Sequence, residues 1–291
     1  MLTESRPGPL DLVVVGGLTV DRFDDGSSAP GGSVIHIARA AAPRGVRLGI
    51  VTAAGPEDVA AAGVAELERV AARLEVAARP ATATFRHREG EDRRRLWLER
   101  DGGDVAPWPE ARDRPATRAV LFAPVATEIG ADALRFWDEA LPRGAILQGW
   151  LRAVAEDREV TQLALSRLDD PLRGLLGRLD VVVASREALS AEADLPSDQL
   201  PALRAVLGGK PVLVVTGGAD GLWLDLPGHG VGAALHVQVP WRVEGAATVG
   251  AGDILAAFLT MGAKDPVGGW RAHVERAMRV VAEVLEERKR G

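Results

Sequence analysis

The chain has 291 residues, 47% hydrophobic, 26% charged and 4% aromatic, a composition typical of a globular protein with one large domain or two small ones. Lysine and arginine number 35 against 41 aspartates and glutamates, and the net charge of −6 argues against a general nucleic-acid or anionic-membrane surface. The absence of cysteine excludes disulfides, thiol nucleophiles and thiolate metal sites. Because there is no run of about eighteen apolar residues and no basic-then-apolar leader, we expect a cytoplasmic protein.

Short apolar runs rich in valine, isoleucine and leucine alternate with helix-like segments along the chain. This alternation is typical of a parallel sheet that is buried on both faces. We predict strands at residues 12–15, 48–52, 120–122, 145–147, 181–184 and 212–216, and helices at 33–42, 56–72, 132–141, 200–207, 254–261 and 274–287. The last helix is amphipathic and is expected to end in a frayed basic tail.

Residues 82–100 break this order, because apolar and polar side chains alternate at 84–87 and again at 96–99. An alternation of period two predicts a β-hairpin. A hairpin inserted into an α/β domain cannot bury both of its faces, so it is either a lid that stands over a site or an ordinary edge hairpin. The sequence favours neither alternative.

The strongest local motif is Gly250-Ala251-Gly252-Asp253, which runs directly into an apolar helix. Glycines let the backbone approach a ligand closely, and the free N–H groups of a helix's first turn attract anions. A carboxylate beside a bound phosphoryl group accepts the proton of an attacking hydroxyl, which is one role for Asp253. The commoner role is a helix cap, and the motif taken alone favours the cap.

A second glycine cluster, Gly31-Gly32-Ser33, opens a helix and follows Asp21 by a short loop after the first strand. Ligands of open α/β sheets bind beyond the carboxyl ends of the strands, where Asp21 could accept hydrogen bonds from substrate hydroxyls. A turn with an N-cap at Ser33 is the alternative. Residues 216–221, Thr-Gly-Gly-Ala-Asp-Gly, close another strand, and a turn alone would explain them. Neither a P-loop nor a dinucleotide-binding glycine motif is present, so the corresponding enzymes are not supported.

Together, these motifs resemble the ribokinase-like (PfkB) carbohydrate kinase family across most of the chain. The matching features are an early strand ending in an aspartate, a Gly-Gly pair opening the first helix, a strand ending in Thr-x-Gly-x-x-Gly, and a late Gly-Ala-Gly-Asp. Residues 123–128 and 148–152 resemble the branch of myo-inositol kinase-like proteins. The resemblance implies a single domain over residues 1–291, with a three-layer α/β/α fold, a mainly parallel sheet, and a small β lid at about 18–30 and 80–105.

The resemblance also implies an ATP-dependent kinase that uses magnesium and phosphorylates a hydroxyl of a sugar, cyclitol or nucleoside. Asp253 is then the general base, and the amides of Gly250, Ala251 and Gly252 stabilise the transferred phosphoryl group. The other implied residues are Asp21, Gly31, Gly32, Ser33, Gln148 and Arg152 on the substrate side, Thr216, Gly218 and Gly221 on the nucleotide side, and Glu187 for magnesium. Arg152 is explained equally well as a solvated charge.

The family often uses its lid as a dimer surface. An exposed apolar lid face at Phe85, Leu96 and Leu98 would therefore indicate a homodimer. Trp97 alternates onto the other face of the hairpin and is a candidate to lie over the substrate. No nucleic-acid or membrane partner is expected.

Three positions depart from the pattern of the family. Ala247 replaces an aspartate, which puts any monovalent-cation site in doubt unless Glu244 reaches in. Val249 replaces a threonine, a change that backbone amides survive, and Ala184 replaces the asparagine of the magnesium motif. These departures motivate a second hypothesis, in which the protein is a catalytically weak relative that binds a metabolite and acts as a sensor or regulatory protein.

Overall fold

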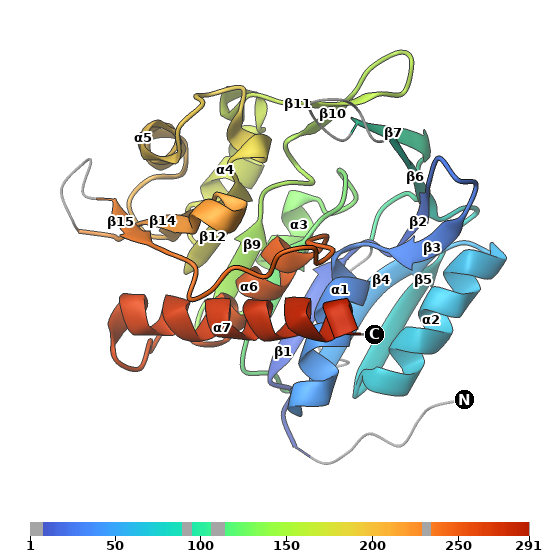
Figure 1. Ribbon diagram of the computed structural model, residues 1–291, viewed down its shortest axis with the longest axis horizontal. Coiled ribbons are helices and arrows are strands. Elements are labelled where there is room, and N and C mark those ends of the chain that lie inside the picture. Colours follow the sequence, from blue (N-terminus) through green and yellow to red (C-terminus); the bar gives the residue numbers. More distant parts are fainter. Residues whose placement is uncertain (1–7, 89–94, 106–113, 229–233, 291) are drawn as a thin grey trace.

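The computed structural model describes residues 8–88, 95–105, 114–228 and 234–290 (Figure 1). A nine-stranded sheet runs through the described chain in the order β15-β14-β13-β12-β9-β8-β1-β4-β5. Neighbouring strands are parallel from β13 to β5, and β14 and β15 are antiparallel additions at one edge. The strands of this main sheet are β1 (Leu12–Gly16), β4 (Leu48–Ala54), β5 (Arg73–Ala78), β8 (Val120–Ala123), β9 (Arg143–Ile146), β12 (Val181–Ser185), β13 (Val212–Thr216), β14 (Leu222–Asp225) and β15 (Leu235–Val237).

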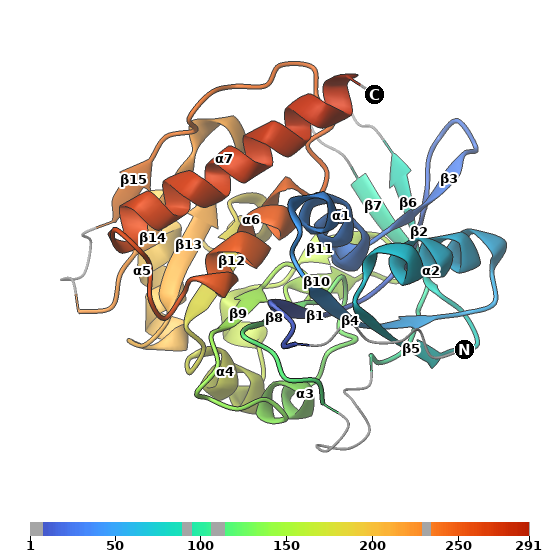
Figure 2. The ribbon, with the colours of Figure 1, turned by 90° about the horizontal axis from the view of Figure 1, so that it is seen from below.

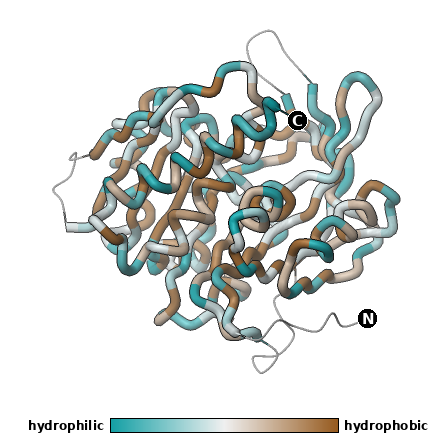
Figure 3. The backbone as a smooth tube through the Cα atoms, turned by 60° about the horizontal axis from the view of Figure 1, so that its bottom comes forward, coloured by the Kyte–Doolittle hydropathy of each residue, from teal (hydrophilic) through white to brown (hydrophobic). Residues whose placement is uncertain are grey.

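Helices cover both faces of the main sheet. One face carries α1 (Ser33–Ala41), α2 (Asp58–Val70), α6 (Ala251–Met261) and α7 (Gly269–Arg290), and the other carries α3 (Ala131–Arg135), α4 (Asp170–Leu176) and α5 (Pro196–Leu207) (Figure 2). Successive side chains of β1 alternate between the two hydrophobic cores, Leu12 and Val14 in one and Val13 and Val15 in the other. The hydrophobic strands accordingly run through the interior in Figure 3. The three-layer α/β/α fold predicted from the sequence is confirmed.

A second, four-stranded sheet lies beside the main sheet and is called the lid sheet here (Figure 1). It consists of β3 (Ser28–Gly31), β2 (Thr19–Arg22), β6 (Ala83–Arg88) and β7 (Arg95–Arg100). The pair β6 and β7 is antiparallel, as the alternation predicts, and β2 joins it in parallel with β6. Residues 89–94 of the expected lid lie outside the described residues.

The apolar face of the lid sheet is covered by the same chain. Phe85 and Leu98 are only 3% and 4% exposed and pack against Val125, which follows β8. An exposed apolar face at Phe85 and Leu98 would have indicated a homodimer, and these two side chains are buried instead. Trp97 is 8% exposed, and three guanidinium groups lie 4.9–5.4 Å from its ring, those of Arg86, Arg88 and Arg95. Trp97 is thus packed among arginines.

A small hairpin joins the lid sheet to the main sheet. It consists of β10 (Arg152–Val154) and β11 (Val160–Gln162). The amide of Leu98 in β7 donates a hydrogen bond to the carbonyl of Arg158, in the turn of this hairpin, at 3.0 Å. The hairpin therefore places Arg152, its first residue, directly under the lid sheet.

The largest differences between predicted and observed helix ends concern two helices. The helix predicted at 132–141 stops at Arg135, because the Asp138 side chain accepts the amide of Ala140 in a turn and Pro142 disfavours helix before it. The basic tail does not fray at Glu287, because α7 continues to Arg290, which pairs with Glu286 at 3.3 Å. None of the helices in the described part of the chain is long and apolar enough to cross a membrane.

Candidate active site

Asp253 lies in the first turn of α6, which begins at the left-handed Gly250 (φ 79°). Its Oδ1 accepts a hydrogen bond from the hydroxyl of Ser33, the first residue of α1, at 3.0 Å. Burial raises the pKa of Asp253, against the opposing effects of His36, the Ser33 hydrogen bond, Arg152 and Arg288. A carboxylate whose pKa is raised in this way is a stronger base than a solvated aspartate.

The amides expected to bind an anion are only partly free. Ala251 donates its amide to the carbonyl of Thr248 at 3.0 Å. No described residue accepts a hydrogen bond from the amides of Gly250 and Gly252. These two N–H groups, at the positive end of the α6 dipole, can therefore bind an anionic group next to Asp253.

Asp21 lies in β2, beside Gly31 of β3. Its Oδ1 accepts a hydrogen bond from the Thr19 hydroxyl at 2.9 Å and lies 3.4 Å from Nε2 of His87 in β6. An ideal Cβ placed on Gly31 would lie 2.1 Å from Oδ2 of Asp21, so only glycine leaves room for the carboxylate in this position. The next residue, Gly32, has a φ of 89° and starts α1.

Arg152 lies within electrostatic range of both Asp21 and Asp253. Its Nη1 donates a hydrogen bond to the carbonyl of Val125, and its guanidinium lies 5.2 Å from the centre of the Phe85 ring in the lid sheet. Burial lowers the pKa of Arg152, against the attraction of Glu128, Asp253 and Asp21. Arg152 is half-buried and bonded to a backbone carbonyl, so it is not a freely solvated surface charge.

Glu128 is the last residue of the motif at 123–128, but it is not among the site residues predicted from the sequence. It is 9% exposed and accepts three backbone amides, those of Gly17 at 3.1 Å, Val125 at 2.7 Å and Ala126 at 2.7 Å. Burial raises its pKa, and the backbone hydrogen bonds oppose that effect. Glu128 thus ties the end of β1 to the loop on which Arg152 rests.

His36 is a second residue that sequence reasoning missed. It lies one turn after Ser33 on α1, and its ring packs so closely on Gly250 that an ideal Cβ there would be 2.3 Å from Cγ. Its Nδ1 is buried without a hydrogen-bond partner. Burial lowers the pKa of His36, and the charge of Asp253 opposes this. The helical spacing of three residues from Ser33 was the available signal.

Other predicted residues make no direct bond to Asp253 in the described part of the chain. Thr216, Gly218 and Gly221 form the turn after β13, where Arg186 donates its amide to the carbonyl of Thr216. Gln148 is half-buried just after β9. No hydrogen bond or ion pair in the described part of the chain joins any of these residues to Asp253.

Glu187 follows β12 and is exposed. Within residues 8–88, 95–105, 114–228 and 234–290, no group of three or more potential ligands could hold a metal ion by itself. Magnesium is commonly bound by one or two carboxylates together with substrate phosphates and water. The lone carboxylate of Glu187 fits that mode of binding, with the phosphates supplied by a bound donor.

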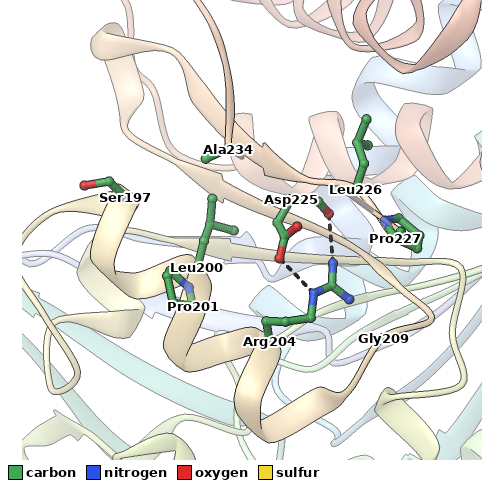
Figure 4. Close-up of a pocket in the computed structure, with 10 residues that line it drawn as sticks. Ser197, Leu200, Pro201, Arg204, Gly209, Asp225, Leu226, Pro227 and Ala234 are labelled. Carbon is green, nitrogen blue, oxygen red and sulfur yellow. Dashed lines mark hydrogen bonds and ion pairs between the residues drawn. The ribbon is translucent and has the colours of Figure 1, made fainter. Parts of the chain in front are cut away.

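A hollow elsewhere in the molecule belongs to a different region. It lies between α5 and β14, and Figure 4 shows Arg204 within it, paired with the Asp225 carboxylate at 2.7 Å and with its backbone carbonyl at 3.0 Å. The guanidinium also donates to the carbonyls of Gly208 and Pro211. Because these contacts occupy the polar groups of Arg204, the hollow offers no chemistry comparable with that around Asp253.

No family model matches the chain, and no curated protein matches it. Solved structures do match. A pyrophosphate-dependent kinase in the ribokinase family, complexed with a pyrophosphate analogue and myo-inositol, has a TM-score of 0.70 at 19% identity over 94% of this chain and 95% of that chain. A PfkB protein from a Polaromonas species has a TM-score of 0.60 at 16% identity over 95% and 96%. The chain has the ribokinase-like fold.

A fructokinase double mutant from Vibrio cholerae, in a form with fructose, ADP and potassium ion bound, shares the ribokinase-like fold with a TM-score of 0.63 at 18% identity, over 95% of this chain and 91% of that chain. The resemblance inferred from the motifs is therefore confirmed at the level of the fold, and a myo-inositol kinase is among the similar structures. Two of the similar proteins are a myo-inositol kinase and a fructokinase.

Proposed function

We propose that the protein is a phosphotransferase that moves a phosphoryl group onto a hydroxyl of a small sugar or cyclitol. The observation that carries the proposal is the position of Asp253, a half-buried carboxylate held by Ser33 at 3.0 Å beside two unpartnered backbone amides. The base therefore lies next to a helix N-terminus that can bind an anion. This combination suits the attack of a hydroxyl on a phosphoryl group.

In the proposed mechanism, the acceptor hydroxyl lies between Asp21 and Asp253, with Arg152 beside it. Asp253 takes the hydroxyl proton as the acceptor oxygen forms its bond to phosphorus. The bond between that phosphorus and the leaving phosphate oxygen breaks at the same time, and the leaving group keeps the electron pair. The amides of Gly250 and Gly252 and the charge of Arg152 offset the negative charge on the transferred group.

The pocket chemistry supports a polyhydroxylated acceptor. The Asp21 carboxylate accepts hydrogen bonds, and the Arg152 guanidinium donates them, which together match a ring of hydroxyls. The aromatic ring of Phe85 and the strands of the lid sheet lie above Arg152, where they can exclude water from the transfer. A nucleoside acceptor is a variant of the same proposal.

We propose ATP with magnesium as the phosphoryl donor, with Thr216, Gly218 and Gly221 on the nucleotide side and Glu187 toward the metal. Pyrophosphate is the second candidate, because similar structures include pyrophosphate-dependent kinases. A magnesium ion would neutralise the donor phosphates.

The proposal is tested by a thermal-shift screen followed by turnover. ATP, ADP and pyrophosphate are each combined with magnesium and with a panel of polyols, sugars and nucleosides. A ligand that binds only the folded protein raises the melting temperature. We expect one donor and one acceptor to stabilise the protein and to react together. An acceptor that stabilises it equally in Asp253→Ala, with no turnover under any donor, would support the metabolite-binding protein instead.

A further inference from the structure

The loop that leads into α6, residues 238–250, is bonded to helix α7. Residues 238–250 contain no helix or strand, yet they position the amides of Gly250 and Gly252. Apart from the bond that Ala251 of α6 donates to Thr248, every hydrogen bond between residues 241–249 and another element in the described part of the chain goes to α7. Nε1 of Trp241 donates to Glu286 at 3.0 Å, and Arg288 donates to the carbonyls of Ala247 and Val249.

The Arg288 contacts lie directly before the anion-binding amides. A single nitrogen, Nη1, bonds to the carbonyl oxygen of Val249 at 2.6 Å and to that of Ala247 at 3.2 Å. Two backbone carbonyls that converge on one positive charge form a cation-binding arrangement. Here the cation is part of the chain, and Ala247, at the position where the resemblance expected an acid, contributes only its carbonyl.

The end of α7 is itself fixed on the domain. Its inner face, including Val274, Met278 and Val284, is buried against the helices on the same side of the sheet. Arg44, just after α1, binds Glu287 at 2.9 Å and lies 3.6 Å from Glu283. The end of α7 is therefore fixed on the domain. Arg288 is part of this end, so its guanidinium holds the loop in a defined position.

Charge ties Arg288 to the site as well. Burial lowers the pKa of Arg288, as does its neighbour Arg39, while the attraction of Asp253 opposes both. The charge of Arg39 is compensated by Glu66, which accepts two hydrogen bonds at 2.7 and 2.8 Å. Arg288 forms no ion pair with a carboxylate among the described residues, and the negative charge of Asp253 favours its charged form.

We propose that Arg288 is a positioning residue whose guanidinium holds the carbonyls of Ala247 and Val249 and so fixes the amides of Gly250 and Gly252 for the phosphoryl group, which makes turnover independent of a monovalent metal ion. This inference rests on the proposed function. According to this inference, the side chain of Arg288 in α7 orders the loop that precedes α6.

The test compares Arg288→Ala and Arg288→Lys with Arg290→Ala as the matched control. Arg290 lies about half a turn further along α7, and its side-chain hydrogen bonds within the described residues go to Glu286 of its own helix. We expect Arg288→Ala to lose roughly 100-fold in kcat, because small misplacements of an active site have effects of this size. Free guanidinium, at concentrations far below those that unfold proteins, should restore part of the loss, and lysine should retain part of it. Arg290→Ala should match the wild type.

Two further measurements separate this inference from a merely structural role and from the proposed function. Wild-type turnover should be equal in potassium and in choline buffers. Amide hydrogen exchange at 249–252, measured without substrate, should be faster in Arg288→Ala alone. The inference is overturned by a potassium requirement of the wild type, by unchanged exchange, or by a loss in Arg288→Ala that guanidinium does not restore. If the wild type shows no turnover, the proposed function is contradicted. In that case, amide hydrogen exchange at 249–252 still tests whether Arg288 orders the loop.

Discussion

The hydroxyl of Ser33 donates a hydrogen bond of 3.0 Å to the carboxylate of Asp253, across 220 residues of sequence. This bond joins the first turn of α1 to the first turn of α6 on the same face of the main sheet. The two glycine motifs of the chain therefore lie next to each other in the fold. Neither motif taken alone was sufficient to predict a functional site. A helix cap explains either motif separately, whereas the bond between them brings a base to two free amides.

The raised pKa of Asp253 predicts the acidic limb of the pH profile. Because the base must be ionised, kcat/KM should fall as the pH decreases through the pKa of Asp253, which burial holds above the ordinary 3.8. Arg152→Met removes a positive charge that lowers this pKa, so the limb should move to higher pH in the variant. Arg135→Met, on the exposed side of α3, is the control and should leave the limb in place. An Arg152→Met profile with an unshifted limb would contradict the electrostatic contact.

Asp253 should also reduce the stability of the folded protein. The folded state keeps the Asp253 proton to higher pH than the unfolded chain does, so the free energy of unfolding falls as the pH rises from 3.8 through the raised pKa. Asp253→Asn removes this titration and should be more stable than the wild type at neutral pH, with a difference that shrinks as the pH is lowered. Urea unfolding at several pH values measures it. A difference that does not vary with pH would count against a buried ionisable group.

Gly250 should not tolerate a side chain. Its φ of 79° is left-handed, and a Cβ would lie 2.3 Å from the ring of His36. Gly245→Ala separates the two effects, because Gly245 has a φ of 73° but open space around it. We expect Gly245→Ala to lose roughly 1–2 kcal/mol from backbone strain alone and Gly250→Ala to lose more. The measurement is chemical denaturation. The second change His36→Ala should return part of the additional loss, and a double variant no better than Gly250→Ala would disprove the steric contact.

Glu128 should be important for stability. Removing its carboxylate leaves three backbone amides without this acceptor, two of them buried, and takes away one of the three acids that attract Arg152. Glu128→Ala should therefore reduce the free energy of unfolding by about 3 kcal/mol. Asp132→Ala, which removes a side chain that is 94% exposed, should change it little. Equal stability of the two variants, measured by urea titration, would refute the role assigned to Glu128.

Local patterns were sufficient for most of the main sheet. The valine and leucine runs of β1, β12 and β13 lie at the predicted positions, because strands buried on both faces must be apolar throughout. The edge strand β5 (Arg73–Ala78) was missed, since its residues are half-buried and form no apolar run. The antiparallel strands β14 and β15 were missed for a related reason, because they are short and lie at the other edge.

The site was predictable only where its residues fall in motifs. Asp253 and Ser33 stand next to glycine pairs that mark helix starts, and the structure joins them. His36 and Arg288 stand beside no glycine motif, since each acts through a contact distant in sequence. Glu128 lies in the motif at 123–128, but its bond to Gly17 could not be predicted locally. Arg288 in particular belongs to a basic segment that composition alone assigns to a frayed end, and only the position of α7 brings it to the carbonyl of Val249.

The most direct test of the central claim is phosphorus NMR of the product formed by wild type and by Asp253→Asn, with the donor and acceptor identified by the screen. Asparagine keeps the size of the side chain and an oxygen that can accept the Ser33 hydrogen bond, but it cannot take a proton. The account predicts a phosphorylated acceptor with the wild type and a rate lower by roughly 10²–10⁴ with the variant, while both bind the ligands. Equal rates in the two proteins would contradict the assignment of Asp253 as the base.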